Sequence, residues 1–194
     1  MPSSNDTYKK AGPVTGFTLR GNGGLLLQIV IPITVRIPEV FKSLPHDFVS
    51  TQAIWDTGAT GSVIDERLAK RMGLPQIGMA TVQTAKGSQD VPTFSVDVVL
   101  NNQVRFLGLV VSAGDLGEGA IQFLVGMDIV AAGDSVLMQE VIGGKPCTVF
   151  SFRYPSLRRP VDFVAEINRY NTDQQFKASN KILRKEYNEK RRRK

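Results

Sequence analysis

The 194-residue chain contains one cysteine and one histidine. The single cysteine, Cys147, rules out an intramolecular disulfide and any cysteine-rich metal site, and it is compatible with a reducing compartment. The single histidine, His46, lies in an expected loop and argues against a histidine-based zinc site. We therefore expect neither a metal nor a cofactor, and we assign no role to His46.

A long hydrophobic run is also missing. The most apolar stretch, Gly24–Ile33, is interrupted by Gln28 and Pro32 and is far shorter than the roughly 20 residues that a membrane-spanning helix needs. The first ten residues are polar and lack the apolar segment of a secretory signal, although a signal already removed would leave the same sequence. We expect an intracellular, cytoplasmic protein without a membrane span.

Net positive charge is absent outside the C-terminus, because residues 1–180 contain 16 basic and 16 acidic residues. Residues 181–194 contain eight Lys or Arg and two Glu, which accounts for the whole net charge of +6. A basic body would indicate a nucleic-acid groove, whereas a basic tail indicates an arm that attracts phosphate or acidic surfaces, or simply a solvated terminus. Nucleic acid is therefore expected as a partner only through residues 181–194.

The composition favours many short strands and turns over a helical bundle, because the chain has 18 Gly, 10 Pro and 10 Phe. Its length predicts one domain plus appendages, at roughly 150 residues per domain. We expect a disordered segment at 1–15, a mostly β domain at 16–154, and a C-terminal extension at 155–194 with a possible helix and the basic tail.

Turn residues between apolar runs predict four hairpins within the β domain. Short helices are predicted at Asp65–Met72, with Asp65 at the N-terminus and Gly73 as the C-terminal stop, and at 126–132. The predicted hairpins are 17–37 around Gly21–Gly24, 81–94 with its tip at 85–88, 95–111 around Asn101-Asn102, and 136–152 around Gly143-Gly144.

The most informative segment is Ala53–Ile64, in which an apolar strand leads into Asp56-Thr57-Gly58-Ala59. A strand that ends in a turn holds the carboxylate rigidly, and Gly58 lets the backbone approach whatever meets Asp56. Taken alone, Asp-Thr-Gly favours a local Asx-turn, in which the carboxylate bonds to its own backbone, because three common residues recur by chance. The surrounding sequence is therefore needed to interpret it.

The segments around this turn follow a characteristic order. The turn is followed by an apolar pair, a short helix and a hairpin. The segment Phe123–Asp128 comes about 70 residues after Asp56. From Leu25 to Phe152 this order resembles the retropepsin family, the retroviral-type aspartic proteases, and looks most like their cellular and bacterial members. The resemblance implies a closed β-barrel or sandwich lobe with a flap hairpin and one or two short helices.

The resemblance also implies roles for the turn residues. Asp56 matches the catalytic aspartate, and Thr57 matches the threonine that braces the two active-site loops across a dimer. Gly58 matches the residue whose carbonyl holds the substrate backbone, and Ala59 supports the same loop. The flap that closes over the peptide would consist of Thr84, Ala85, Lys86 and Gly87.

Other positions are interpreted as structural. Leu124-Val125-Gly126 matches the strand that passes behind the catalytic loop, and Asp128 matches a structural position. The flap lacks the several glycines of viral enzymes, and Trp55 replaces a smaller aliphatic residue, so we expect Trp55 to pack beneath the loop. Residues 155–194 have no counterpart in a minimal retropepsin.

Aspartic-protease chemistry needs two carboxylates that share one proton, and this chain has one Asp-Thr-Gly and no internal repeat. We therefore expect a homodimeric aspartic endopeptidase that hydrolyses an extended polypeptide with water activated between two Asp56 side chains. The hairpin Val136–Phe152 is the expected source of much of the interface. The alternative is a retropepsin-fold module that binds peptides or organises an assembly with little or no proteolysis.

Overall fold

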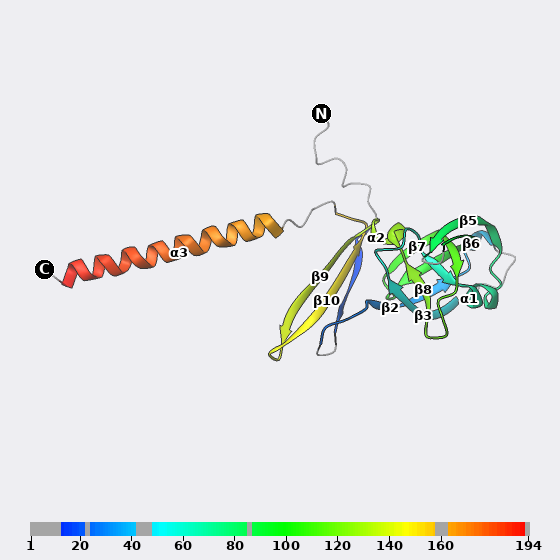
Figure 1. Cartoon of the computed structure of the whole chain (residues 1–194), viewed down its shortest axis with the longest axis horizontal. Helices are drawn as coiled ribbons and strands as arrows, with labels where there is room; N and C mark the ends of the chain where they lie inside the picture. Colours follow the sequence, from blue (N-terminus) through cyan, green and yellow to red (C-terminus); the bar gives the residue numbers. More distant parts are fainter. Residues whose placement is uncertain (1–12, 22–23, 42–47, 85–86, 158–162, 193–194) are drawn as a thin grey trace, which may run out of the picture. The chain divides into compact units, whose positions relative to one another are not determined.

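The computed structural model describes residues 13–21, 24–41, 48–84, 87–157 and 163–192 (Figure 1). The chain separates into two compact units, residues 1–157 and 158–194. His46 lies outside the described residues, and so do residues 1–12 of the predicted segment 1–15.

The first unit is built around a seven-stranded sheet in the order β2-β3-β8-β4-β7-β6-β5. An additional pairing of β2 with β6 closes six of these strands into a barrel and leaves β5 as an outer strand paired with β6. The predicted closed β-barrel is therefore confirmed. Its strands are β2 (Val30–Arg36), β3 (Phe48–Trp55), β4 (Val63–Asp65), β5 (Gln76–Thr84), β6 (Gly87–Leu100), β7 (Val104–Gly114) and β8 (Ile121–Val125).

Alternating apolar residues fill the barrel. In β2 and β6 the side chains that point inward are fully buried, while their neighbours along each strand are more exposed, as the period of two in a strand requires. Tight pairing of Val35 with Val98 closes the barrel at this point. The buried residues on these two strands include Ile31, Ile33, Val35, Val96, Val98 and Leu100.

A second sheet has the order β1-β10-β9, with β1 at Thr15–Arg20, β9 at Asp134–Ile142 and β10 at Lys145–Tyr154. The predicted hairpin 17–37 is wrong, because β1 pairs with β10 and not with β2. Aromatic rings on β1 and β10 explain why β1 pairs with β10. Phe17 lies 6.1 Å from Phe150 and 5.9 Å from Phe152 between ring centroids, so the non-local pairing buries three aromatic side chains.

Two predicted turns have the backbone that their residues favour. Asn101 and Asn102 adopt positive φ angles of 46° and 57° between β6 and β7, and Gly143 and Gly144 adopt 59° and 78° between β9 and β10. Glycine and asparagine tolerate this left-handed region, which allows a tight connection between antiparallel strands. The predicted hairpins around these turns are confirmed.

The described residues of the first unit contain few helices. They are a 3₁₀ turn η2 (Glu39–Phe41), α1 (Glu66–Arg71) and α2 (Met127–Val130). The Asp65 side chain accepts a hydrogen bond from the backbone N–H of Arg67 and caps α1, and Gly73 follows with φ +63°, as predicted.

The second unit contains α3 (Phe163–Arg192), a 30-residue helix that agrees with the possible helix predicted after Pro155. Among the described residues, no helix combines the length and apolar character needed to cross a membrane.

Candidate active site

Asp56 begins the turn that follows β3. Its backbone N–H donates to the carbonyl of Val125 at 2.9 Å, which ties the start of the turn to the end of β8. The parallel pairing of Trp55 with Val125 brings β8 directly behind this point. The two strands therefore fix the position at which the carboxylate leaves the sheet.

The turn itself is closed by its carboxylate. Asp56 Oδ1 accepts a hydrogen bond of 2.8 Å from the N–H of Gly58, and the carbonyl of Asp56 accepts one of 3.4 Å from Ala59. The Asp56 side chain is partly accessible, and Thr57 and Gly58 are exposed. The four predicted catalytic and supporting residues thus lie together in one turn that faces outward.

Trp55 supports the turn from inside, as predicted. Its side chain is 7% exposed and meets Phe150 and Phe152 at centroid distances of 5.0 and 4.9 Å in edge-on arrangements. The aromatic cluster therefore connects the catalytic turn to the second sheet.

Gly126 allows the closest backbone approach in the site. A Cβ atom placed on it would lie 2.4 Å from the carbonyl carbon and oxygen of Gly61 and 2.9 Å from the nitrogen of Ser62. Immediately after it, the N–H of Met127 donates to the carbonyl of Ala59 at 2.8 Å. A side chain at position 126 would collide with the loop that contains Gly61, so this packing requires glycine there.

Ser62 and Asp128 form a pair that links this loop to α2. Both Asp128 oxygens accept hydrogen bonds from Ser62, one from its hydroxyl at 2.7 Å and one from its N–H at 2.9 Å. The Ser62 hydroxyl oxygen accepts in turn from the N–H of Gly126 at 3.1 Å. This agrees with a structural position for Asp128. Ser62 is not among the predicted site residues, and the only sequence feature that could have indicated it is its position in a turn rich in Ser and Thr.

A second linkage missed by the sequence joins Asp65 and Arg67. The carboxylate of Asp65 is buried and accepts two hydrogen bonds from the guanidinium, at 3.0 and 2.9 Å, and one from the N–H of Leu116 at 3.2 Å. Arg67 also donates to the carbonyl of Gly117. Hydrogen bonding from Arg67, opposed by burial, lowers the pKa of Asp65 to about 2.

The predicted flap lies on different elements from the catalytic turn. Thr84 ends β5 and pairs with Gly87 at the start of β6, while Ala85 and Lys86 lie outside the described residues. The hairpin stem is held by an exposed hydrogen bond of 2.6 Å between Thr81 and Asp90. Around the closed barrel, β6 is separated from β3 by β2 on one side and by β7, β4 and β8 on the other, and β5 lies beyond β6.

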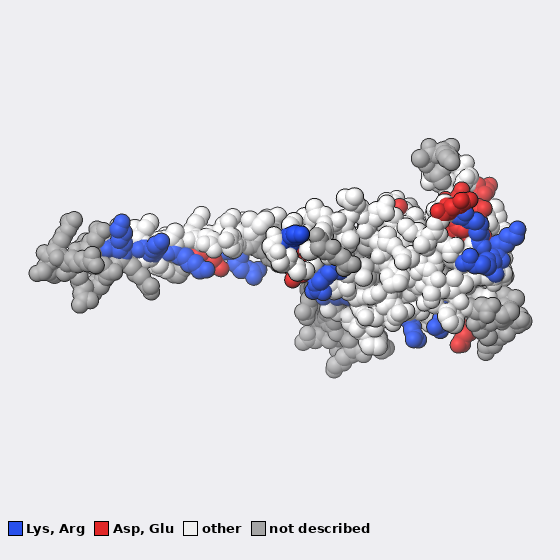
Figure 2. All heavy atoms as spheres, turned by 90° about the horizontal axis from the view of Figure 1, so that it is seen from below, with Lys and Arg blue, Asp and Glu red and all other residues white. Residues whose placement is uncertain are grey.

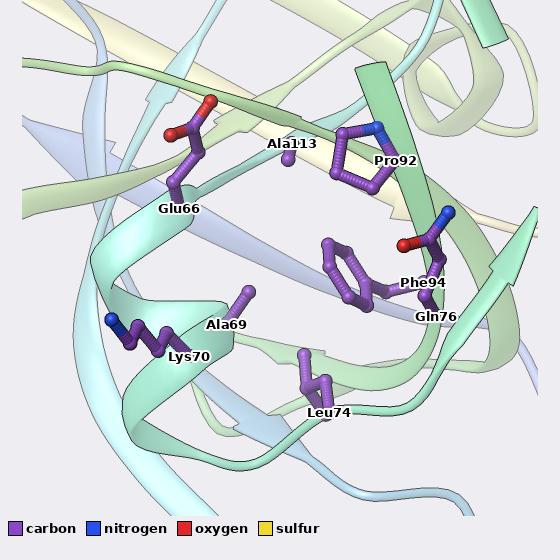
Figure 3. A pocket seen from close by; sticks show the side chains of 8 residues that line it. All are labelled: Glu66, Ala69, Lys70, Leu74, Gln76, Pro92, Phe94 and Ala113. Carbon is purple, nitrogen blue, oxygen red and sulfur yellow. The ribbon is translucent and has the colours of Figure 1, made fainter. Parts of the chain in front are cut away.

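A pocket of about 470 Å³ lies between α1 and the strands β5, β6 and β7 (Figure 3). The side chains of Phe94, Leu74 and Ala69 point into it, and Glu66 and Lys70 lie on α1 beside it. The residues of the catalytic turn do not line this pocket. Within the described ranges, no cluster of three His, Cys, Asp or Glu side chains could hold a metal ion.

Residues 47–129 match a protein family described as aspartyl protease. The resemblance to the retropepsin-like aspartic proteases is confirmed. The match covers the Asp56 turn, the predicted flap and the Gly126–Asp128 segment.

Three solved structures are similar to this chain. A retropepsin-like aspartic protease from Rickettsia conorii is 16% identical, with a TM-score of 0.43, over 73% of this chain and 95% of that one. The retroviral protease-like domain of Ddi1 from Leishmania major is 18% identical, with a TM-score of 0.37, over 63% and 93%. The Simian Foamy Virus (mac) protease is 17% identical, with a TM-score of 0.34, over 52% and 91%. No curated protein matches the chain.

Proposed function

We propose that this chain is one half of a homodimeric aspartic endopeptidase. The observation that carries the proposal is the Asp56 turn: a partly accessible carboxylate, positioned by β3 and β8, inside a segment that matches an aspartyl protease family. The chain contains a single Asp-Thr-Gly, so each subunit supplies one carboxylate. A two-fold dimer would bring two copies of Asp56 together.

The chemistry follows from the two carboxylates. At about 3 Å separation both cannot be ionised, so the pair holds one proton between them and titrates as a unit. The ionised carboxylate takes a proton from a water molecule as the water oxygen attacks the scissile carbonyl carbon. The protonated carboxyl gives its proton to the carbonyl oxygen, and a tetrahedral diol forms. Collapse of this diol breaks the C–N bond, and the nitrogen leaves with a proton.

The hydrogen bond within the turn supports this role. The N–H of Gly58 donates to Asp56 Oδ1, which fixes the direction of the carboxylate. The exposure of Thr57 and Gly58 leaves both free to meet a second subunit or a substrate backbone. The hairpin tip at Thr84–Gly87 would close over an extended peptide, and the substrate is therefore proposed to be a polypeptide.

The dimer interface is proposed to include β9. This strand forms one edge of the second sheet, so one row of its backbone groups is unpaired within the sheet (Figure 1). Four of its apolar side chains are exposed: Leu137 by 59%, Met138 by 49%, Val141 by 72% and Ile142 by 46%. An exposed apolar edge strand tends to pair with another chain, and a second copy would cover this one.

The test is cleavage of a denatured protein substrate by wild type and by Asp56→Asn, with and without a statine-type transition-state analogue. Loss of the general acid–base pair should lower the rate at least about 100-fold, and the analogue should inhibit the wild type. Glu118→Gln removes an exposed carboxylate elsewhere and should leave the rate unchanged. Equal cleavage by wild type and Asp56→Asn would reject the proposal, and saturable peptide binding without hydrolysis would indicate a binding module instead.

A further inference from the structure

Helix α3 carries nearly all the unbalanced charge of the protein. Residues 177–194 contain nine Lys or Arg and two Glu, while the preceding 176 residues carry 15 basic and 16 acidic groups. The basic segment therefore has a net charge of +7 and the remainder has −1. Most of this segment lies on α3, which extends to Arg192.

Lys177, Lys181 and Lys185 are spaced by four residues along α3, and their side chains are exposed. Residues at this spacing are neighbours on one side of a helix, and at 1.5 Å per residue the row extends about 12 Å. Figure 2 shows Lys and Arg side chains gathered along one side of this helix. The row is therefore a continuous cationic strip.

The strip has few acidic partners. Asp173 lies one turn before Lys177, and Glu186 and Glu189 follow Lys185, but no acidic residue occurs between Gln174 and Lys185. Like charges four residues apart on a helix repel and weaken it. A bound row of anionic groups would relieve this repulsion, so an extended anionic ligand fits the strip.

We propose that α3 binds the phosphate backbone of duplex nucleic acid without regard to sequence. A regularly repeated phosphate charge complements lysines repeated at each helical turn, and such binding needs no base contacts. An anionic membrane fits less well, because an interfacial helix needs a broad apolar face. Among the described side chains of α3, the exposed large apolar ones lie mainly before the lysine row, at Val164, Ile167 and Tyr170, and within the row only Ile182 is of this kind.

The experiment measures binding of the full-length chain to two labelled duplexes of unrelated sequence, each about 20 base pairs, by fluorescence anisotropy over a range of salt concentrations. We expect similar affinities for both duplexes and a steep fall in affinity with salt. The variant Lys177→Gln/Lys181→Gln/Lys185→Gln should reduce the slope of log K against log salt by about 2–3, because each phosphate that a lysine neutralises adds roughly 0.9 to that slope. Gln retains high helix propensity, and circular dichroism checks that the helix remains.

A matched control removes the same charge from the first unit. Lys70, Arg105 and Lys145 are exposed, and replacing all three by Gln should leave the slope unchanged within about 0.5. Equal slopes for the α3 variant and the wild type would overturn the proposal. Stronger binding to phosphatidylserine-containing vesicles than to either duplex would also overturn it, in favour of a membrane surface. Neither outcome depends on proteolysis, so the proposed peptidase activity is tested separately.

Discussion

Behind the Asp56 turn, two chain segments can pack together only because residue 126 is a glycine and has no side chain. Gly126 lies against the backbone of Gly61 and Ser62, at distances that a Cβ atom could not share. Only when these segments approach so closely can Met127 donate to Ala59 and Ser62 reach Asp128. The glycine thus holds together the back of the site without touching the carboxylate.

Replacing Gly126 with Ala should therefore destabilise the fold and lower proteolytic activity. Overpacking of this kind costs about 1–3 kcal/mol, which thermal or urea unfolding would measure. Gly119→Ala is the control, because a Cβ at that position would meet nothing within 4 Å. If the two variants had equal stability, the close approach at Gly126 would not be a constraint in solution.

Asp65 predicts a pH dependence of stability. Its pKa is lowered from 3.8 to about 2 by hydrogen bonds from Arg67, so the ionised form is favoured in the folded state. This contribution is present above pH 3.8 and is lost as the pH falls toward 2. A shift of this size corresponds to about 2 kcal/mol.

The variant Asp65→Asn should be less stable than wild type near neutral pH by at least that amount, about 2 kcal/mol, and the difference should shrink at about pH 2. Urea unfolding at both pH values measures it. Glu39→Gln, which changes an exposed side chain in η2, should unfold like the wild type at both pH values. A difference for Asp65→Asn that stayed constant from neutral to acid pH would contradict the assigned pKa.

Among the elements, β9 combines an edge position with four exposed apolar side chains. It pairs with β10 alone, whereas the outer strand β5 pairs with β6 and exposes two large apolar side chains, Ile77 and Met79. Its charge-free sequence from Ser135 to Gln139 offers little resistance to edge pairing.

A lysine at the β9 edge should weaken the proposed dimer. Val141→Lys places a charge among the exposed apolar residues, and we expect at least a tenfold weaker self-association by analytical ultracentrifugation, about 1.4 kcal/mol. Leu107→Lys introduces the same charge on β7, at a side chain that is 77% exposed, and should not alter association. Identical dimerisation of both variants would place the interface elsewhere.

For the whole molecule, the proposed function places one carboxylate on each chain, so activity would require the dimer. Wild type mixed with an equal amount of Asp56→Asn and allowed to exchange would form about a quarter wild-type homodimers if pairing is random. Activity should then fall to about half of that of the same wild-type amount alone. Equimolar Glu118→Gln in place of Asp56→Asn should not reduce it. If Asp56→Asn had no effect after exchange was verified, a single chain would contain the full site.

Local structure was largely predictable from the sequence. The Asp65 cap, the Gly73 stop and the two turns at Asn101-Asn102 and Gly143-Gly144 follow from residues within a few positions of each other. Short-range hydrogen bonds and allowed φ angles act on neighbours in the chain, so their signals are local. The Asp56 turn and the motifs that carry the family resemblance are likewise short contiguous segments of the sequence.

Partners distant in the chain were decided by the tertiary structure. The pairing of β1 with β10, the Ser62–Asp128 pair and the approach of Leu116 to Asp65 join residues more than 50 positions apart. Both β1 and β2 have strand-like sequences, and only burial of the aromatic rings around Trp55 distinguishes the possible partners of β1. The sequence thus determined where strands, turns and the Asp56 carboxylate occur. Three-dimensional packing determined which of them meet, because burial rewards contacts regardless of their separation along the chain.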